Sequence, residues 1–569
     1  MAKPLLVAPS PAVALLDPYV IERPVIDPDL VLDFNESLAP PASLAGAACA
    51  VHRYPEYDEI EQFIADRLAI EKRSVVLTCG ADDALERAVR CVLAPGRRAI
   101  LTTPSYGMIR RFAMLAGAEV DEVEWWTGDL PVDEMCGLAD DDVDLVAIVS
   151  PSNPSGAVVS SAAFERLVAR LPQALVVLDQ AYVDFCDPVF DLSSVALRHP
   201  NVVVVRTLSK AWGCAGLRVG YAFGDPRVID WMRRVGQPFP VASPSIGAAM
   251  AALAAGPDLH RIASVCEQRE GLSGLLRDLG AEVLPSNGSF VLARFGDAEF
   301  VWRGLGALGI SVRRFSGRSD LEGWLRITLP GDEESFARLV RGLKTVLSPE
   351  AVLFDMDGVL ADVSGSYRRA IIETAATWGV ELSGRDIALA KAEGDAANDW
   401  ELTRKLLAAR GVEADIDQVT NRFEAVYQGT EESPGLRRFE SLRITRAVLE
   451  NVASKYRLAV VTGRPRADAQ RFLEEQAIGD LFSALVCMED AAAKPDPKPV
   501  KIALSRVGGS TAWMFGDTPD DVRAARGAGV LAIGVTAPGD DVESASAALH
   551  KAGAVAVIEH PNTIREIMP

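Results

Sequence analysis

The chain has 569 residues, of which 49% are hydrophobic, and a formal net charge of −21 at pH 7. This length predicts more than one domain, and the acidic balance argues against a nucleic-acid-binding protein, because such proteins present a basic face. Eight cysteines are scattered without a Cys-x-x-Cys pair, so neither a zinc ribbon nor a disulfide framework is indicated.

The N-terminal segment has a short apolar run at residues 5–7, which Pro4, Pro9 and Pro11 flank closely. These prolines disfavour a signal peptide. No apolar run approaches the roughly 18 residues needed to span a bilayer. We therefore expect a cytoplasmic protein without a membrane anchor.

Four polar loops in the first half of the chain each follow an apolar run. The runs cover residues 75–77, 144–149, 174–178 and 202–205, and the loops that follow are residues 80–83, 150–156, 179–182 and 207–212. Such runs predict buried parallel strands, which bring the loops to the edge of an α/β sheet where ligands bind. There Lys210 can act as a nucleophilic amine, and Ser209 and Arg218 can hold a phosphate.

These loops, with Asn153, Asp179 and Lys210 at corresponding places, resemble those of the fold-type I pyridoxal-phosphate-dependent aminotransferases. The resemblance covers about residues 15–346 and is strongest to the histidinol-phosphate aminotransferase family. It implies pyridoxal 5'-phosphate as cofactor and a large α/β domain followed by a small α+β domain. Lys210 would be the catalytic residue that holds the cofactor and moves a proton.

The resemblance also assigns contacts to the cofactor ring. Tyr106, after a fifth apolar run at residues 99–102, would stack on the pyridine ring. Asn153 and Tyr182 would hydrogen-bond the ring oxygen, and Asp179 would pair with the ring nitrogen. A buried carboxylate at that position keeps the nitrogen protonated, which lets the ring accept electrons.

The cofactor phosphate would lie where a strand turns into a helix after Gly80. The free N–H groups at such a helix start favour an anion, so Ala81 and Asp82 are expected to bind it together with Ser209 and Arg218. An ordinary helix cap by Asp82 or Asp83 is compatible with this role. By the same resemblance, Tyr54 would reach the phosphate of a neighbouring subunit, which implies a homodimer.

The substrate side of this first site is expected to contain arginine. Arg326 matches the residue that grips the carboxylate of glutamate or the anionic end of the substrate, and the planar guanidinium suits either anion. Arg313 and Tyr19 are the candidates for binding a substrate phosphate. A strand-edge arginine in a surface ion pair is the alternative interpretation of Arg313.

The second half of the chain contains another ordered set of motifs. Apolar runs at residues 351–354, 458–461 and 513–515 precede Asp355-Met-Asp357, Thr462-Gly463 and the acidic loop at 516–521, and Lys494 lies between the last two. Crowded carboxylates at Asp355, Asp517 and Asp521 repel one another unless a hard cation neutralises them, and oxygen ligands indicate magnesium.

The four motifs resemble those of the haloacid dehalogenase (HAD) superfamily, with a HAD-like Rossmannoid α/β domain. A helical insertion at about residues 365–440 resembles the α-helical cap of the phosphoglycolate-phosphatase-like subgroup. The resemblance implies that Asp355 attacks phosphorus, and that Asp357 protonates the leaving alcohol and adds its backbone carbonyl to the Mg²⁺ site. Thr462 and Lys494 would bind the phosphoryl oxygens.

Together the two resemblances imply a bifunctional enzyme of histidine biosynthesis, with domains at residues 1–348 and 349–569. Transamination between glutamate and imidazole-acetol phosphate would give histidinol phosphate, and the second domain would release histidinol. The alternatives are a threonine-phosphate decarboxylase-like first domain, or a phosphatase for another ester such as phosphoglycolate. A transcription factor on this fold would need a basic N-terminal DNA-binding domain, for which residues 1–35 are too short.

Overall fold

The computed structural model describes residues 26, 28–33, 35, 54–138, 143–393, 398–430 and 434–569, without the side chains of residues 31 and 391–393. The chain divides into two compact units. The first consists mainly of Val31–Ala298 and Val312–Ala337, and the second mainly of Glu299–Ser311 and Arg338–Pro569. The domain boundary at residue 348 stays a prediction.

A seven-stranded sheet forms the centre of the first unit, with the strand order β2-β8-β7-β6-β5-β3-β4. Its strands are β2 (Val75–Thr78), β3 (Arg98–Thr103), β4 (Glu119–Glu124), β5 (Val143–Val149), β6 (Leu175–Asp179), β7 (Val202–Thr207) and β8 (Gly220–Gly224). Strand β8 pairs antiparallel with both β2 and β7, and the other strand pairs are parallel, so β8 runs opposite to the rest of the sheet. The carboxyl ends of β2, β3, β5, β6 and β7 therefore meet at one edge, as the apolar runs predict.

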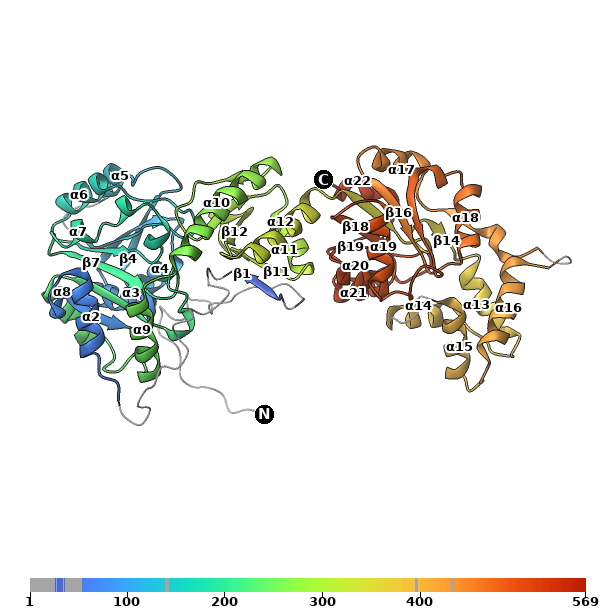
Figure 1. The fold of residues 1–569 in the computed structure, drawn as a ribbon, viewed down its shortest axis with the longest axis horizontal. Coiled ribbons are helices and arrows are strands. Elements are labelled where there is room, and N and C mark those ends of the chain that lie inside the picture. The colour runs from blue at the N-terminus through green and yellow to red at the C-terminus, as the bar shows by residue number, and fades with distance from the viewer. Residues whose placement is uncertain are drawn as a thin grey trace. The chain divides into compact units, whose positions relative to one another are not determined.

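Both faces of this sheet are buried, which explains its apolar strands. In β7, Val202 and Val204 belong to one hydrophobic cluster and Val203 and Val205 to another, because successive side chains point to opposite faces. Helices α2 (Asp58–Leu68) and α6 (Ser161–Arg170) contribute to the first cluster. The second cluster contains residues of α3 (Gly80–Val92), α4 (Gly107–Leu115) and α8 (Pro226–Val235). Figure 1 shows these helices around the sheet.

A five-stranded sheet has the order β1-β11-β12-β10-β9. Its strands are β1 (Leu30–Leu32), β9 (Glu282–Val283), β10 (Phe290–Arg294), β11 (Ile310–Arg314) and β12 (Trp324–Thr328). Strand β12 pairs antiparallel with both β10 and β11, and Arg313 lies directly opposite Arg326. The remaining long helices of this part of the chain are α9 (Ser243–Ala255), α10 (Leu259–Asp278), α11 (Ala298–Ala307) and α12 (Glu333–Leu347).

The second unit contains a parallel six-stranded sheet with the order β17-β16-β13-β18-β19-β20. The strands are β13 (Ala351–Phe354), β16 (Arg457–Val461), β17 (Phe482–Val486), β18 (Ala512–Gly516), β19 (Leu531–Val535) and β20 (Ala556–Ile558). Helices α17 (Arg446–Ala453), α18 (Arg466–Glu475), α19 (Lys498–Arg506), α20 (Pro519–Gly527) and α21 (Val542–Ala552) follow or separate these strands. Because β13 lies between β16 and β18, the motifs that follow these three strands lie side by side.

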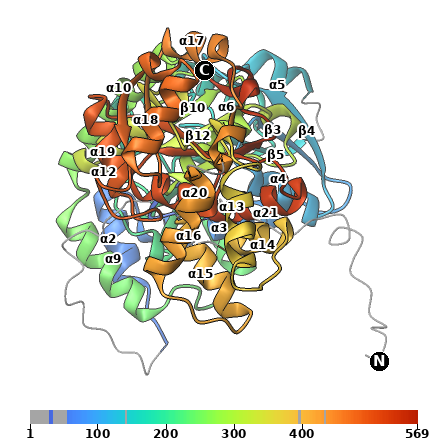
Figure 2. The same ribbon diagram turned by 90° about the vertical axis from the view of Figure 1, so that its right-hand side faces the viewer.

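The predicted helical insertion is present in the second unit. The chain leaves the core through β14 (Ala361–Asp362) and returns through β15 (Ser441–Leu442), and these two strands pair antiparallel. Between them lie α13 (Tyr367–Ala376), α14 (Gly384–Glu393), α15 (Asp399–Ala409) and α16 (Ile416–Gln428). Figures 1 and 2 both show these helices grouped together. Among the described residues, no helix is long and apolar enough to cross a membrane.

Candidate active sites

The first candidate site lies at the strand-end edge of the seven-stranded sheet. Lys210 follows β7, and its Nζ lies 5.6 Å from the centre of the Tyr182 ring. Tyr182 comes shortly after β6. Its hydroxyl accepts hydrogen bonds from the side-chain amides of Asn35 at 2.9 Å and Asn153 at 3.5 Å. The structure thus brings together side chains from loops that are distant in the sequence.

Asp179 ends β6 and is only 3% exposed. Its Oδ1 accepts a hydrogen bond from the backbone N–H of Ala181 at 2.9 Å. Burial raises the pKa of the carboxyl to about 7, and the bond from Ala181 and the nearby Lys210 oppose the rise. A carboxyl in these surroundings would be stabilised as an anion by a cationic group placed against it, as the predicted pairing with a protonated ring nitrogen requires.

The raised pKa of Asp179 predicts a pH-dependent effect on stability. In the cofactor-free protein the folded state holds this proton more tightly than the unfolded chain, so wild-type stability is lost as pH rises from about 4 towards 7. Asp179→Asn removes this loss. The variant should gain about 2–3 kcal/mol more free energy of unfolding over wild type at pH 8 than at pH 5. Urea unfolding of both proteins at the two pH values measures the difference. An equal gain at pH 5 and pH 8 would contradict the raised pKa of Asp179.

The start of helix α3 and Arg218 form a cradle suited to a phosphate. Gly80 has φ +76°, and a Cβ there would lie 2.7 Å from a guanidinium nitrogen of Arg218, so glycine leaves room for that side chain. Arg218 Nη1 donates to Ser209 Oγ at 3.4 Å, and Thr207 donates to the same hydroxyl oxygen at 2.9 Å. A helix N-terminus, a guanidinium and a hydroxyl together are a donor set that fits a dianion.

The side chain of Asp82 is engaged within this cradle. Its carboxylate accepts a hydrogen bond from the Tyr106 hydroxyl at 2.7 Å and lies 3.5 Å from Arg218 Nη2. Asp82 and Ala81 are therefore suited to contact an anion through their backbone N–H groups, which lie in the first turn of α3. Neighbouring Asp83 instead accepts from the backbone N–H of Cys79, which directly precedes α3, at 2.8 Å, and forms an ion pair with Arg87 at 2.7 Å.

Arg326 lies in the same network and is 7% exposed. It donates to Asn153 Oδ1 at 2.6 Å and to the backbone carbonyl of Asp33 at 2.7 Å. Arg313 lies opposite Arg326 in the strand pairing, so the two side chains emerge on the same face of the sheet.

Tyr19 lies outside the described residues. Tyr54 is 78% exposed and stacks on Phe239, with 4.5 Å between the ring centres.

Asn35 and Thr328 complete the network although the sequence interpretation assigned them no role. The Asn35 backbone N–H donates to Thr328 Oγ1 at 3.2 Å, and the Thr328 hydroxyl donates to Asn35 Oδ1 at 2.5 Å. These two residues are 293 positions apart, so no local pattern connects them. The signal that could have found Asn35 is its place within the segment at residues 33–37, which resembles the substrate-side arm of the aminotransferase family.

The second candidate site lies at the end of β13. Lys494 Nζ lies 2.5 Å from Asp355 Oδ1, forms an ion pair with Asp521 and donates to the Val461 carbonyl at 3.2 Å. Carboxylate oxygens of Asp355, Asp517 and Asp521 lie within 4.8 Å of one another. This all-oxygen donor set fits Mg²⁺.

The turn after Asp355 is shaped around these acids. Gly358 has φ +76°, and a Cβ at this position would collide with the Asp517 carboxylate. Burial raises the pKa of Asp355 above its ordinary value, and the ammonium of Lys494 opposes the rise. Burial alone would lower the pKa of Lys494, but Asp355 and Asp521 raise it above its ordinary value, so the side chain is an ammonium. One cation therefore offsets part of a crowded negative charge.

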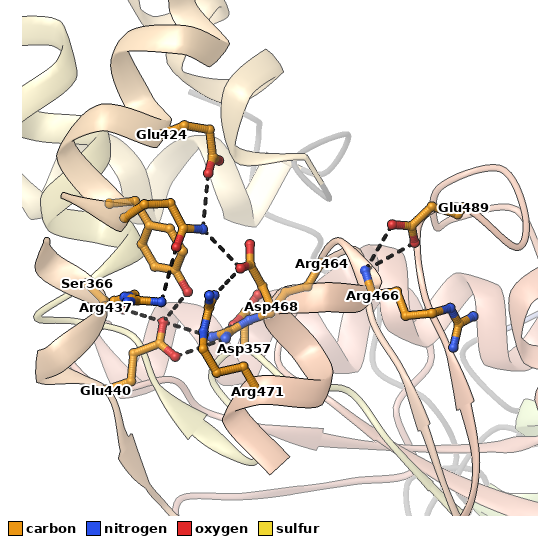
Figure 3. Close-up of polar contacts among 12 residues, drawn as sticks. Asp357, Ser366, Glu424, Arg437, Glu440, Arg464, Arg466, Asp468, Arg471 and Glu489 are labelled. Atoms are coloured by element: carbon orange, nitrogen blue, oxygen red, sulfur yellow. Dashed lines mark hydrogen bonds and ion pairs between the residues drawn. The ribbon is translucent and has the colours of Figure 1, made fainter. Parts of the chain in front are cut away.

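Asp357 and Thr462 have a different partner. Asp357 Oδ1 accepts a hydrogen bond from Arg464 Nε at 2.7 Å, and Figure 3 shows the two side chains together. Thr462 is buried, and its Oγ1 accepts from the backbone N–H of Arg464 at 3.1 Å. The Asp357 carboxylate is not one of the three clustered acids, and the prediction that its backbone carbonyl binds the metal stays a prediction. Arg464 itself was missed, although it stands two residues after Thr462.

Comparisons with known proteins agree with this division into two sites. The sequence matches the family described as "Aminotransferase class I and II" over residues 29–343, and "haloacid dehalogenase-like hydrolase" over residues 349–529. It is 32% identical over 362 residues to histidinol-phosphate aminotransferase 1 of Cupriavidus pinatubonensis, an alignment that covers 58% of this chain and 96% of the relative.

Two further similarities are informative. The chain is 43% identical over 197 residues to a protein of Phytophthora nicotianae named imidazoleglycerol-phosphate dehydratase, covering 33% of this chain and 44% of that relative. The solved structure of histidinol-phosphate aminotransferase from Sinorhizobium meliloti, in complex with pyridoxal-5'-phosphate, superposes with a TM-score of 0.52 at 23% identity. That superposition covers 59% of this chain and 97% of the solved chain and shows a shared fold.

The fold and the two sites define an aminotransferase joined to a hydrolase. The chain belongs to the class I and II aminotransferases and carries a haloacid dehalogenase-like hydrolase domain after the aminotransferase region.

Proposed function

We propose that this protein catalyses two consecutive steps of histidine biosynthesis. The first region transfers the amino group of glutamate to imidazole-acetol phosphate and gives histidinol phosphate, and the second region hydrolyses that ester to histidinol. The observation that carries the proposal is the presence, in one chain, of a lysine–aspartate–arginine site in an aminotransferase related to histidinol-phosphate aminotransferases and a three-carboxylate site in a hydrolase domain.

In the first site pyridoxal phosphate is the cofactor, and it supplies a carbonyl group for amine exchange and a ring that accepts electrons. Lys210 holds it and moves a proton between carbon atoms, and Asp179 keeps the ring nitrogen protonated. Asn153 and Tyr182 orient the ring by hydrogen bonds to its oxygen, and Tyr106 stacks on it. The phosphate is bound by Ala81, Asp82, Ser209 and Arg218.

Substrate binding in the first site is assigned to arginines. Arg326 binds the carboxylate of glutamate or the anionic end of the keto substrate, for which its buried, planar guanidinium is suited. Arg313, on the same face, binds the substrate phosphate together with Tyr19. We further propose a homodimer, in which the exposed Tyr54 reaches the cofactor phosphate of the second subunit.

In the second site Mg²⁺ is held by Asp355, Asp517, Asp521 and the Asp357 carbonyl, and it neutralises charge on the phosphoryl group. An oxygen of Asp355 forms a bond to phosphorus while the bond to the leaving alcohol breaks. Asp357 gives its proton to the leaving oxygen. Water then attacks phosphorus and gives a proton to Asp357, while the bond between Asp355 and phosphorus breaks, which releases inorganic phosphate and restores the Asp355 carboxylate.

Histidinol phosphate is the substrate that the similarities favour for this second site. The relatives from Phytophthora nicotianae and Cupriavidus pinatubonensis have different names. Each name nevertheless contains that of an imidazole-bearing phosphate ester, imidazoleglycerol phosphate in the first and histidinol phosphate in the second. Because an aminotransferase of this kind produces such an ester, a phosphatase domain in the same chain meets its substrate at a raised local concentration.

Phosphate release tests the second activity directly. The full-length protein with Mg²⁺ should release phosphate from histidinol phosphate with a kcat/KM at least about tenfold above that for phosphoglycolate, because the cap selects the alcohol part. Excess EDTA should abolish phosphate release while amino-group transfer in the same sample continues, since only the second site needs the metal. No release from histidinol phosphate at saturating concentration would contradict the proposed substrate.

A further inference from the structure

Arg464 is a buried arginine in the loop between β16 and α18. Its side chain is 1% exposed, and its Cζ lies 4.7 Å from the centre of the Tyr367 ring and 5.4 Å from that of Phe472. Arginine is almost never fully buried unless it is paired. Its partners therefore explain why it is there.

One partner is the predicted general acid of the second site. Arg464 donates from Nε to Asp357 Oδ1 at 2.7 Å, and its Nη2 lies 2.5 Å from the same oxygen. Both contacts fall on Oδ1. A proton on Asp357 is then carried by Oδ2, so the guanidinium fixes both the plane of the carboxyl group and the identity of its donor oxygen.

The other partner is Glu440, directly before β15. Arg464 donates from Nη1 to Glu440 Oε2 at 2.9 Å and from Nη2 to Oε1 at 3.2 Å, and Figure 3 shows Arg464 between the two acids. The Glu440 side chain is 7% exposed. A single guanidinium thus spans two carboxylates that are 83 positions apart in the sequence, 440 minus 357.

Glu440 also joins the two ends of the cap. Its Oε1 accepts hydrogen bonds from Ser366 Oγ and from the Tyr427 hydroxyl, each at 3.0 Å. Ser366 directly precedes α13, the first cap helix, and Tyr427 lies in α16. If the cap ends moved apart, Glu440 would lose these contacts, and the arginine that holds Asp357 would lose its second anchor.

We propose that Arg464 is a positioning residue that aims Asp357 Oδ2 at the leaving oxygen of the phosphate ester and, through Glu440, links this aim to the packing of the cap. The proposal rests on the phosphatase activity proposed above. In the step concerned, Asp355 forms the bond to phosphorus, the ester P–O bond breaks, and the proton on Asp357 moves to the departing alkoxide. Arg464 takes no part in bond making.

A comparison of leaving groups distinguishes positioning from a general structural role. An alkoxide needs the proton from Asp357, whereas p-nitrophenolate departs without it. The value of kcat/KM includes only steps up to departure of the leaving group, so the later hydrolysis step does not enter. Arg464→Lys, which keeps the charge and loses the planar fork, should lower kcat/KM about 100-fold for histidinol phosphate and less than about threefold for p-nitrophenyl phosphate.

Four further variants complete the test. Glu440→Gln should also lower kcat/KM more for histidinol phosphate than for p-nitrophenyl phosphate, because it weakens the second contact that holds Arg464. Adding Arg464→Lys to Asp357→Asn should cause no further loss, since the arginine acts through that carboxyl. Arg457→Lys is the matched control, because Arg457 lies at the opposite end of β16 and donates to the carbonyls of Val507 and Gly508, both at 2.8 Å. This control variant should leave kcat/KM for both esters unchanged.

The outcomes separate this inference from the proposed function. If wild-type protein hydrolyses neither ester, the phosphatase proposal fails. If wild type hydrolyses both and Arg464→Lys lowers both equally, the positioning proposal fails while the phosphatase proposal stands. A wild type that hydrolyses only p-nitrophenyl phosphate also overturns positioning, because the alkyl leaving group is then not protonated. Should Arg464→Lys fail to fold, Glu440→Gln decides instead. An equal loss of kcat/KM for histidinol phosphate and p-nitrophenyl phosphate in that variant would overturn the positioning proposal.

Discussion

Replacing Lys210 with alanine is expected to lower the rate of amino-group transfer by at least about 10⁴-fold, because the variant loses both the nucleophilic amine and the group that moves the proton. The amine lies 5.6 Å from the Tyr182 ring, in the network that also includes Asn153 and Arg326. Phosphate release from histidinol phosphate by the same variant should stay at the wild-type rate, since that chemistry belongs to the second site.

The assignment of Lys210 has a readout besides activity. Borohydride treatment of the wild type with pyridoxal phosphate should attach the cofactor mass to the peptide that contains Lys210, and the alanine variant should show no such peptide. Lys72→Ala is a matched control, because Lys72 forms an ion pair with the 87% exposed Asp58 and should leave labelling unchanged. Cofactor attached to another lysine in the wild type would contradict the assignment.

Replacing Asp355 with asparagine is expected to lower phosphatase activity by at least about 10⁴-fold, while amino-group transfer stays at the wild-type rate. Asparagine has nearly the same shape as aspartate but cannot attack phosphorus. The fold should tolerate the change, because Lys494 keeps Asp521 and the Val461 carbonyl as partners. Release of phosphate from histidinol phosphate with Mg²⁺ measures the first effect, and a coupled assay for 2-oxoglutarate measures the second.

Asp480→Asn provides the control for this charge change. Asp480 is 62% exposed and pairs with Arg446 on the surface of the second unit, so both activities should be retained. If Asp355→Asn kept more than about a hundredth of wild-type phosphatase activity, the assignment of Asp355 as the nucleophile would be wrong.

The sequence predicted those parts of the sites that follow apolar strands. The run at residues 202–205 became β7, the run at 351–354 became β13, and the polar residues after each strand lie at the sheet edge where parallel strands meet. The helical insertion was also predictable, because its polar and helical composition interrupts the alternation of strands and helices. These features are local, so a single pass along the chain can find them.

The contacts that connect the motifs were not predictable in this way. Asn35 reaches Tyr182, and Arg464 reaches Glu440 across the end of the cap, only because the folded chain brings them together. Arg464 stands two residues after Thr462, but nothing in its neighbours distinguishes a buried bridging arginine from a solvated one. Pairings of this kind depend on tertiary packing, which hydrophobic periodicity does not encode.

The central claim is that one chain performs both steps in succession. The most direct test incubates the full-length protein with pyridoxal phosphate, Mg²⁺, glutamate and imidazole-acetol phosphate, and follows phosphorus by ³¹P NMR. We expect the ester signal to be replaced by that of inorganic phosphate, with one 2-oxoglutarate formed for each phosphate released. Accumulation of histidinol phosphate without inorganic phosphate, or phosphate release without 2-oxoglutarate, would contradict it.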